Sequence, residues 1–313
     1  MKAFGLLLAS AILMFSVAVP AHGNLMWGET STMGWTHAAM VAVTTGQKIY
    51  LIGDRDNLHI YDVAANSWSK GTAPPANQYG PAVALNGKIY IVGGVNGPKI
   101  TGNCAVYDPS SDSWGNCAAL PSPRGAGAAA VLNGKIHLVG GRGYQGATLV
   151  DLNDHLVYDP AADSWHSSTP MPTARDGLSL VADPSSGRLF AIGGFNSQTR
   201  NPSGKTEIYN SAAKSWTEGA RVPTPRFSAG AALLGGQIWF MGGSTTRAMY
   251  SAVEAYNIAG NSWATLGGLP AARPLESAVV VNGTIYATGG DLCQGDTCYK
   301  TNKFWTHTPR AGQ

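Results

Sequence analysis

A short pattern recurs along this chain at nearly constant spacing, and it constrains the fold more than any other feature. At five places a Gly-Gly pair closes a segment rich in Val, Ile, Leu and aromatic residues, and Gly53-Asp54 is a degenerate sixth copy. The five pairs are Gly93-Gly94, Gly140-Gly141, Gly193-Gly194, Gly242-Gly243 and Gly289-Gly290. A recurrence every ~50 residues is typical of repeat architectures, in which one unit buries its faces only by packing against the next.

Each repeat carries two further marks: a Tyr followed by Asp or Asn and, seven residues after the Tyr, a Trp. The five pairs are Tyr61/Trp68, Tyr107/Trp114, Tyr158/Trp165, Tyr209/Trp216 and Tyr256/Trp263. Segments such as Lys88–Val92 are short, rich in β-branched and aromatic residues and bounded by Gly, as buried strands are. Asn86-Gly87 and Asn133-Gly134 predict two-residue hairpin turns, because Asn and Gly tolerate the positive φ that such turns need.

This succession of marks resembles the kelch repeat, and the resemblance covers essentially the whole chain beyond residue 23. One unit reads LNGKIYIVGG at residues 85–94, VYDP at 106–109 and DSW at 112–114. The resemblance implies that each unit forms one blade of four antiparallel strands. With six diglycine-type positions, it implies an all-β, six-bladed kelch β-propeller over residues 24–313.

The ends of the chain predict how the ring closes. Phe304 stands where the last Tyr is expected, and no Trp follows it at the usual interval. Trp27 precedes Gly53 by 26 residues, and each later Trp precedes its next diglycine by 25 to 28 residues. We therefore predict that a strand at residues 25–29 completes the sixth blade beside residues 303–307.

Spacing also separates the scaffold from its variable part. The interval from the first Gly of each pair to the next Tyr, or to Phe304, varies from 8 to 18 residues, whereas the interval from Tyr to Trp is constant. The variable segment contains the loop between the second and third strands, which lies on the same face as the connections between blades. Loops on a rigid scaffold are the usual position of binding residues, so we predict the functional site on this loop face.

The ligand-binding candidates stand at the start of the first strand of a blade or shortly after the diglycine, where side chains commonly contact the ligand in ligand-binding kelch propellers. The candidates are Arg55, Tyr79, Arg124, Arg142, Tyr144, Arg175, Asn196, Arg226, Arg247 and Arg273. Arginines around one channel mouth would suit a carboxylate or another anion, because the guanidinium fork matches a carboxylate. A structural role stays open for the four arginines that precede the first strand of a blade, because Arg at that place belongs to the kelch pattern. Those four are Arg124, Arg175, Arg226 and Arg273.

Three residues near the same mouth are candidates for proton transfer: His37, Asp176 and Asp291. For Asp176 the alternative is an ion pair with the adjacent Arg175. The overall plan is similar to that of exported kelch proteins of the N-acetylneuraminate epimerase type. That resemblance implies a metal-free isomerisation that needs a general acid or base and a carboxylate clamp, although no catalytic motif of that family is matched.

We predict no metal and no cofactor. The histidines lack the ligand spacing of a copper site such as that of galactose oxidase. Asp151 and His155 match two residues of the Glu-x-x-x-Asp-x-x-x-His iron motif of the plant specifier proteins, but Ala147 occupies the Glu position. The chain also lacks a phosphate loop, a dinucleotide fingerprint and a Gly-x-Ser-x-Gly motif.

Composition narrows the class of partner. Charged residues make up 12% of the chain and the net charge is +3, which argues against nucleic acid because a nucleic-acid binder would show a basic stripe. We expect a small-molecule or glycan ligand, with a protein as the alternative partner. The main hypothesis is a propeller that binds a small anionic, sugar-like or peptide ligand. The alternatives are a metal-free isomerase, cyclase or lyase and a protein-interaction scaffold.

The first residues predict export. Lys2 is followed by an apolar run over residues 4–19 and by small residues at 20–23, which is the order of a secretory signal peptide. We predict cleavage near residue 23, a secreted or periplasmic protein and no membrane span thereafter. In an oxidising compartment an even number of Cys predicts disulfides, and local spacing favours Cys104–Cys117 and Cys293–Cys298.

Overall fold

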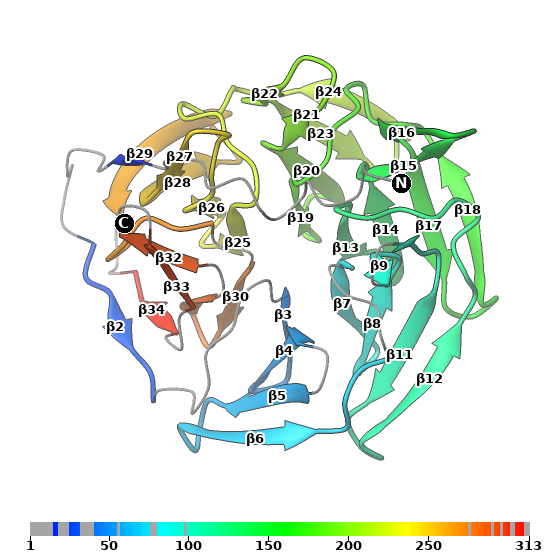
Figure 1. Ribbon diagram of the computed structural model, residues 1–313, viewed down its shortest axis with the longest axis horizontal. Coiled ribbons are helices and arrows are strands. Elements are labelled where there is room, and N and C mark those ends of the chain that lie inside the picture. Colours follow the sequence, from blue (N-terminus) through cyan, green and yellow to red (C-terminus); the bar gives the residue numbers. More distant parts are fainter. Residues whose placement is uncertain are drawn as a thin grey trace.

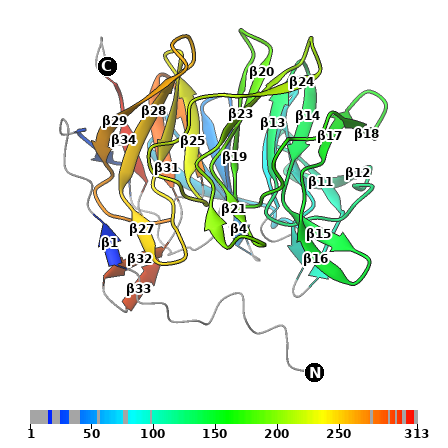
Figure 2. The same ribbon diagram turned by 90° about the horizontal axis from the view of Figure 1, so that it is seen from above.

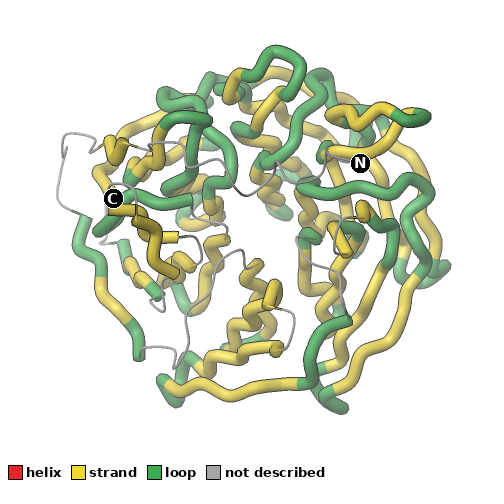
Figure 3. The backbone as a smooth tube through the Cα atoms, in the orientation of Figure 1, coloured by secondary structure: helices red, strands yellow, loops and turns green. Residues whose placement is uncertain are grey.

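The computed structural model describes residues 15–17, 25–31, 41–54, 57–75, 80–96, 99–274, 277–288, 291–294, 297–300 and 304–309. Six antiparallel sheets of four strands stand around a central axis, which confirms the predicted six-bladed propeller (Figure 1). Strands and connecting loops make up the described residues (Figure 3). Among those residues we find no helix long and apolar enough to span a membrane.

Blades 1 to 3 each run outward from the centre in chain order. Blade 1 consists of β3 (Val41–Thr45), β4 (Lys48–Asp54), β5 (Asn57–Asp62) and β6 (Ser67–Gly71). Blade 2 consists of β7 (Ala82–Leu85), β8 (Lys88–Val92), β11 (Cys104–Asp108) and β12 (Ser113–Cys117). Blade 3 consists of β13 (Ala128–Leu132), β14 (Lys135–Val139), β17 (His155–Asp159) and β18 (Ser164–Ser168).

Blades 4 and 5 repeat this order, and blade 6 joins both ends of the chain. Blade 4 consists of β19 (Ser179–Asp183), β20 (Arg188–Ile192), β23 (Thr206–Asn210) and β24 (Ser215–Glu218). Blade 5 consists of β25 (Gly230–Leu234), β26 (Gln237–Met241), β28 (Ala252–Asn257) and β29 (Ser262–Gly268). Blade 6 consists of β30 (Ser277–Val281), β31 (Thr284–Thr288), β34 (Trp305–His307) and, outermost, β2 (Gly28–Glu29).

The predicted closure of the ring is confirmed. Strand β2 pairs antiparallel with β34, placing Gly28 opposite Thr306 and Glu29 opposite Trp305. The Trp27 indole N–H donates to the carbonyl of Gly268 in blade 5, at 3.0 Å. Each of the five remaining repeat Trp residues likewise donates its indole N–H to a backbone carbonyl of the preceding blade. Trp114, for example, donates to the carbonyl of Thr72 at 2.9 Å. The fixed spacing of the Trp residues therefore reflects one hydrogen bond that fastens each blade to its neighbour.

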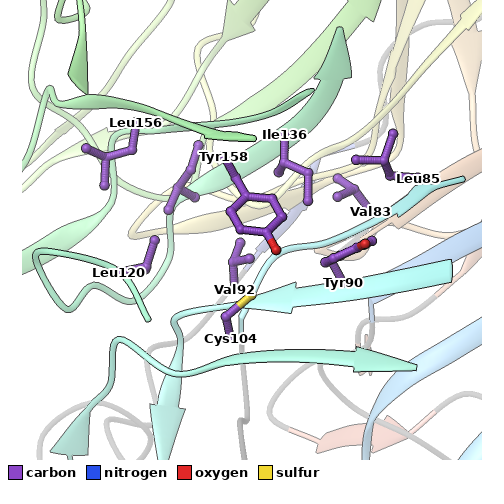
Figure 4. Packing of buried hydrophobic residues seen from close by; sticks show 10 residues of the cluster. Val83, Leu85, Tyr90, Val92, Cys104, Leu120, Ile136, Leu156 and Tyr158 are labelled. Atoms are coloured by element: carbon purple, nitrogen blue, oxygen red, sulfur yellow. The ribbon is translucent and has the colours of Figure 1, made fainter. Parts of the chain in front are cut away.

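Apolar side chains fill the wedges between blades. Figure 4 shows the wedge between blades 2 and 3, where Tyr90 and Val92 of blade 2 pack against Ile136 and Tyr158 of blade 3. Ile136 and Val92 are fully buried. Burying one such aliphatic side chain contributes about 1.5–3 kcal/mol, so the packing in the wedges stabilises the closed ring.

The variable segments form small hairpins on one face, the predicted loop face (Figure 2). They are β9 (Val95–Asn96) with β10 (Lys99–Ile100), β15 (Arg142–Gln145) with β16 (Thr148–Asp151), β21 (Phe195–Asn196) with β22 (Asn201–Pro202), and β32 (Asp291–Gln294) with β33 (Thr297–Lys300). In blade 5, β27 (Ala248–Tyr250) instead pairs parallel with β1 (Phe15–Val17). Strand β1 belongs to the predicted signal peptide, whose cleavage stays a prediction.

The cysteines lie in adjacent strands. Cys104 and Cys117 stand opposite each other on β11 and β12 and form the predicted disulfide, with their Cα atoms 5.0 Å apart. Cys293 and Cys298 also stand opposite each other, on β32 and β33. Their side chains lie outside the described residues, so the second predicted disulfide stays a prediction.

Candidate functional site

A central cavity of about 360 Å³ runs along the axis of the propeller. All six blades contribute to its wall, mostly through the first strand of each blade. The wall is made largely of small residues, among them Ala82, Ala128, Gly177, Ser179, Ser228 and Ala231. The volume falls within the ~300–1,000 Å³ range of small-molecule sites. The described residues of the wall offer little polar chemistry beyond serine hydroxyls and backbone atoms, so we look for selectivity in polar groups at the mouth.

The four arginines that precede a first strand do not line this mouth. Arg124, Arg175, Arg226 and Arg273 are 0–1% exposed. Arg226 shows what they do: its guanidinium donates to the carbonyls of Gly242 (2.6 Å) and Phe240 (2.9 Å) and forms an ion pair with the buried Glu254. Arg226 thus joins three strands of blade 5. Its burial favours the structural role over ligand binding.

Two other members of this group repeat the arrangement. Arg175 forms a buried ion pair with Glu207 of blade 4 and donates to the carbonyl of Ala191 at 3.0 Å. Arg124 pairs with Asp154 at 2.8 Å. The ion pair considered for Arg175 and Asp176 is replaced by the pair with Glu207. Glu207 and Glu254 were not singled out as partners, because the sequence does not show that they face these arginines across the blade.

Arg273 differs in its surroundings. Its guanidinium carbon lies 3.6 Å from the centre of the Trp305 ring, and burial lowers the pKa of Arg273 to about 9. The positions that correspond to two of the acceptors of Arg226, Gly242 and Glu254, fall at Gly289 and Asn302, outside the described residues.

One polar cluster does lie at the mouth, between blades 3 and 4. The Arg142 Nε atom stands 3.5 Å from a carboxylate oxygen of Asp151 and 3.5 Å from one of Asp176. The second Asp151 oxygen accepts from the backbone N–H of Ser197 (2.6 Å) and from its hydroxyl (2.8 Å). Gly177, the residue after Asp176, lines the central cavity. We call Arg142, Asp151, Asp176 and Ser197 the mouth cluster.

The strands of the hairpin and of blade 4 explain how the mouth cluster forms. Arg142 and Asp151 are directly opposite each other on β15 and β16, so the hairpin register sets their pairing. Asp176 exchanges two backbone hydrogen bonds with Phe195, at 3.0 and 2.8 Å, which fixes it at the rim of blade 4. Phe195 in turn packs edge-on against Phe227, with ring centres 5.3 Å apart. The backbone of Asp176 is thereby tied to a segment that is itself held by packing between two aromatic rings.

The cluster holds groups with unused hydrogen-bonding capacity. Within the described residues, Arg142 Nε and Asp151 Oδ1 are buried atoms without a hydrogen bond. The side chain of Asp151 is 2% exposed, that of Asp176 15% and that of Arg142 25%. Burial, and then repulsion from Asp151, raises the pKa of Asp176 to about 7, although Arg142 acts in the opposite direction. Asp176 can therefore hold or release a proton near neutral pH.

The other predicted site residues are dispersed. Tyr144, at the β15–β16 hairpin, is 47% exposed, and Arg247 is exposed beside β27. Asn196 binds the carbonyl of Ala174 at 3.0 Å and the N–H of Thr199 at 2.9 Å, which shapes the loop rather than presenting a free amide. His37, Arg55 and Tyr79 lie outside the described residues, as does the side chain of Asp291.

Asp151 and His155, which match two positions of the iron motif, belong to different networks. Asp151 joins the mouth cluster, whereas His155 is buried between blades 3 and 4, where its Nε2 shares a hydrogen bond of 2.8 Å with His137 Nδ1. The described part of the chain contains no group of three or more His, Cys, Asp or Glu placed to hold a metal ion. Burial lowers the pKa of His137 to about 4 and that of His155 to about 3.

This histidine pair predicts sensitivity to acid. The unfolded chain takes up protons on both imidazoles below about pH 6.5, whereas the folded chain resists protonation until about pH 4. The contribution of the pair to the free energy of unfolding is therefore expected to be complete above about pH 6.5 and to fall by about 4 kcal/mol by pH 5, about 2 kcal/mol for each imidazole. Urea unfolding of the wild type and of His137→Tyr/His155→Leu, measured across this pH range, checks the prediction. The two substitutions are chosen because blade 1 has Tyr50 and Leu58 at the equivalent positions. An equal loss in both proteins would contradict the prediction.

Residues 54–290 match the family model of the Attractin/LZTR1 β-propeller. This chain is a kelch-repeat propeller of that family. Mouse Kelch-like protein 35 is 26% identical over 68% of this kelch propeller and 36% of its own length. Kelch-like protein terF of Aspergillus terreus is 27% identical over 69% of the propeller and 52% of its own length. The kelch propeller thus corresponds to about a third to a half of these relatives.

A solved structure gives an independent comparison of the fold. The structure of YjhT superposes on the kelch propeller with a TM-score of 0.77, covering 88% of this chain and 95% of YjhT at 14% identity. At that identity the likeness concerns the propeller architecture alone, and the chemistry of the mouth depends on the residues of this chain.

Proposed function

We propose that this kelch propeller binds a small polyhydroxylated, sugar-like ligand at the loop face, through the mouth cluster. The observation that carries the proposal is the partly exposed Arg142, held between two carboxylates, one of which belongs to Asp176, the residue before the cavity-lining Gly177. A guanidinium offers hydrogen-bond donors and the two carboxylates offer acceptors. A hydroxyl can both donate and accept, so a ligand with several hydroxyl groups fits this set.

Local charge favours a neutral ligand over an anionic one. The carboxylate clamp expected from the sequence required several exposed arginines, but four of them are buried within the blades. Arg142 faces two aspartates, so the mouth cluster carries no excess positive charge. A carboxylate ligand would meet the field of Asp151, whereas hydroxyl groups would meet groups that can bind them.

A thermal-shift screen tests the proposal. Neutral sugars, sugar acids, organic acids and peptides are compared, because a ligand that binds only the folded protein raises its Tm. We expect a shift with a neutral sugar, and we expect Arg142→Gln to weaken binding about tenfold or more, since a hydrogen bond to a charged group contributes ~1.5–3 kcal/mol. Isothermal titration of both proteins gives the ratio.

The matched control is Lys99→Gln, which removes an exposed positive charge from the β9–β10 hairpin of the same face. It should bind the sugar as the wild type does. Equal weakening in both variants would attribute the effect to net charge. A response to sugar acids alone would favour the anionic hypothesis, and a response to peptides alone would favour a protein-interaction scaffold, which agrees with the general use of kelch propellers in binding proteins.

One observation favours a second candidate function, an isomerase, cyclase or lyase. Asp176 is a largely buried carboxyl whose pKa is raised to about 7, which suits a general acid or base at neutral pH. The assay is turnover of any sugar that binds, followed by NMR as a function of pH. Binding without turnover, or turnover retained in Asp176→Asn, would exclude this role.

Export is a further part of the proposal, supported by the disulfide between Cys104 and Cys117.

A further inference from the structure

In four of the wedges between blades, one side-chain oxygen accepts hydrogen bonds from both of the blades that it joins. Five residues after the repeat Tyr stands an Asp or Asn with positive φ, whose Oδ1 accepts from the Tyr hydroxyl at 2.6–2.7 Å. The same oxygen accepts a backbone N–H from the preceding blade, as Asp112 does from Thr72 at 2.7 Å. The residues are Asn66, Asp112, Asp163 and Asn261. We call this oxygen the wedge acceptor.

The wedge between blades 3 and 4 lacks this acceptor. Lys214 occupies the position, and an ammonium group has no acceptor atom. Lys214 also has a φ of 52°, which Asp and Asn tolerate better than Lys. The Tyr209 hydroxyl bonds instead to the Ser168 hydroxyl, at 2.9 Å. Thr169, which corresponds to Thr72 of the other wedge, donates its hydroxyl proton to the Lys214 carbonyl at 2.6 Å.

A second departure from the repeat occurs in the same wedge. The middle residue of the second strand is a larger aromatic residue in the other five blades, namely Tyr50, Tyr90, Phe190, Trp239 and Tyr286. Blade 3 has the smaller imidazole of His137 there. A pocket of about 520 Å³ opens at this place, and both His137 and Lys214 line it. Two independent exceptions to the repeat pattern therefore line one cavity. Natural proteins tend to depart from such a pattern at functional sites.

The lining of this wedge pocket is basic and rich in hydrogen-bond donors. Besides the residues already named, it includes Asn133, Lys135, His166, Ser167 and Ser211, and none of the described residues that line it is Asp or Glu. Lys135 is neutralised by Asp159. Within the described residues, by contrast, no carboxylate forms an ion pair with Lys214. The pocket thus keeps a positive charge beside the place where the other wedges hold an acceptor oxygen.

We propose that the wedge pocket binds the oxyanion group of a small molecule, whose oxygen takes the place of the missing wedge acceptor. The oxyanion would accept from the Tyr209 hydroxyl and the Thr169 N–H and would pair with Lys214. Phosphate, sulfate and carboxylate share this chemistry. The pocket lies among the turns of blades 3 and 4, on the face opposite the mouth cluster, so its test is independent of the sugar-binding proposal.

Isothermal titration with inorganic phosphate, sulfate and acetate tests the site and separates the three sources of the oxyanion. We expect saturable binding of at least one anion to the wild type. Lys214→Asn restores the residue type of the other wedges, so we expect it to weaken binding at least tenfold. In anion-free buffer we expect the same variant to raise the Tm by about 2–4 °C, because it regains the acceptor and relieves the strained φ.

Two further variants complete the test. Lys99→Asn removes the same charge from a hairpin of the loop face and should bind as the wild type does. Tyr209→Phe keeps the positive charge but removes one donor, and should weaken binding by about threefold or more. Absence of saturable binding for all three anions would overturn the proposal. So would binding that is unchanged in Lys214→Asn, or that falls as much in Lys99→Asn.

Discussion

Replacing Arg226 with Ala is expected to lower the free energy of unfolding by about 3–5 kcal/mol. The guanidinium is fully buried, and its removal would leave the equally buried Glu254 without a counter-charge and would take the Arg226 donors away from the carbonyls of Phe240 and Gly242. Stacking of Arg226 on the Phe240 ring, 4.2 Å from the ring centre, would be lost as well. Urea unfolding followed by tryptophan fluorescence measures the change.

Two companion variants make this prediction specific. Arg226→Met/Glu254→Leu removes both charges and fills the space with apolar atoms, so it should recover most of the loss, as replaced buried ion pairs often do. Arg247→Ala removes an exposed arginine from the same blade and should change stability by no more than about 0.5 kcal/mol. A small effect of Arg226→Ala would return this residue to the ligand-binding candidates.

Asp176→Asn is expected to stabilise the propeller by about 4 kcal/mol at pH 8 and by very little at pH 4. The folded pKa of Asp176 is raised to about 7 by burial and by Asp151, whereas the unfolded pKa is about 3.9. Between those values the folded state binds more protons than the unfolded state, so wild-type stability falls as pH rises from about 4 to about 7. Asn carries no charge at any pH and escapes this loss.

Unfolding measured at pH 4, 6 and 8 checks the size and the sign. Asp108→Asn serves as the control for net charge, because hydrogen bonds from Ser110 and the ion pair with Lys88 hold the pKa of Asp108 down at about 2. That variant should show no gain at pH 8. A gain in both variants would implicate overall charge, and no gain in Asp176→Asn would show that water stabilises the ionised carboxylate. When replacing a residue stabilises the folded protein, that residue is typically one retained for function.

Much of the fold could be predicted from the sequence alone, because the residues that recur in the repeat are the ones that make the packing contacts between blades. The diglycine, Tyr and Trp positions correspond to contacts that recur in each wedge, and the misplaced Trp27 indicated the closing strand. The mouth was harder to predict. Arg142 was identified because it breaks the repeat, but the pairing of Asp151 with Ser197 joins residues 46 positions apart on different blades. No local pattern in the sequence records such a contact.

The four arginines show most clearly which features the sequence determines and which depend on the tertiary structure. The sequence by itself determined that an Arg recurs before the first strand of four blades, that the ring has six blades and that the variable loops share one face. Only the tertiary structure decided whether those arginines face solvent or the blade interior, because that depends on Glu207 and Glu254 reaching them from a different strand. The same holds for Lys214: its place in the repeat can be read from the sequence. That it meets His137 in one pocket depends on how two blades pack, because desolvation and shape are properties of the assembled wedge.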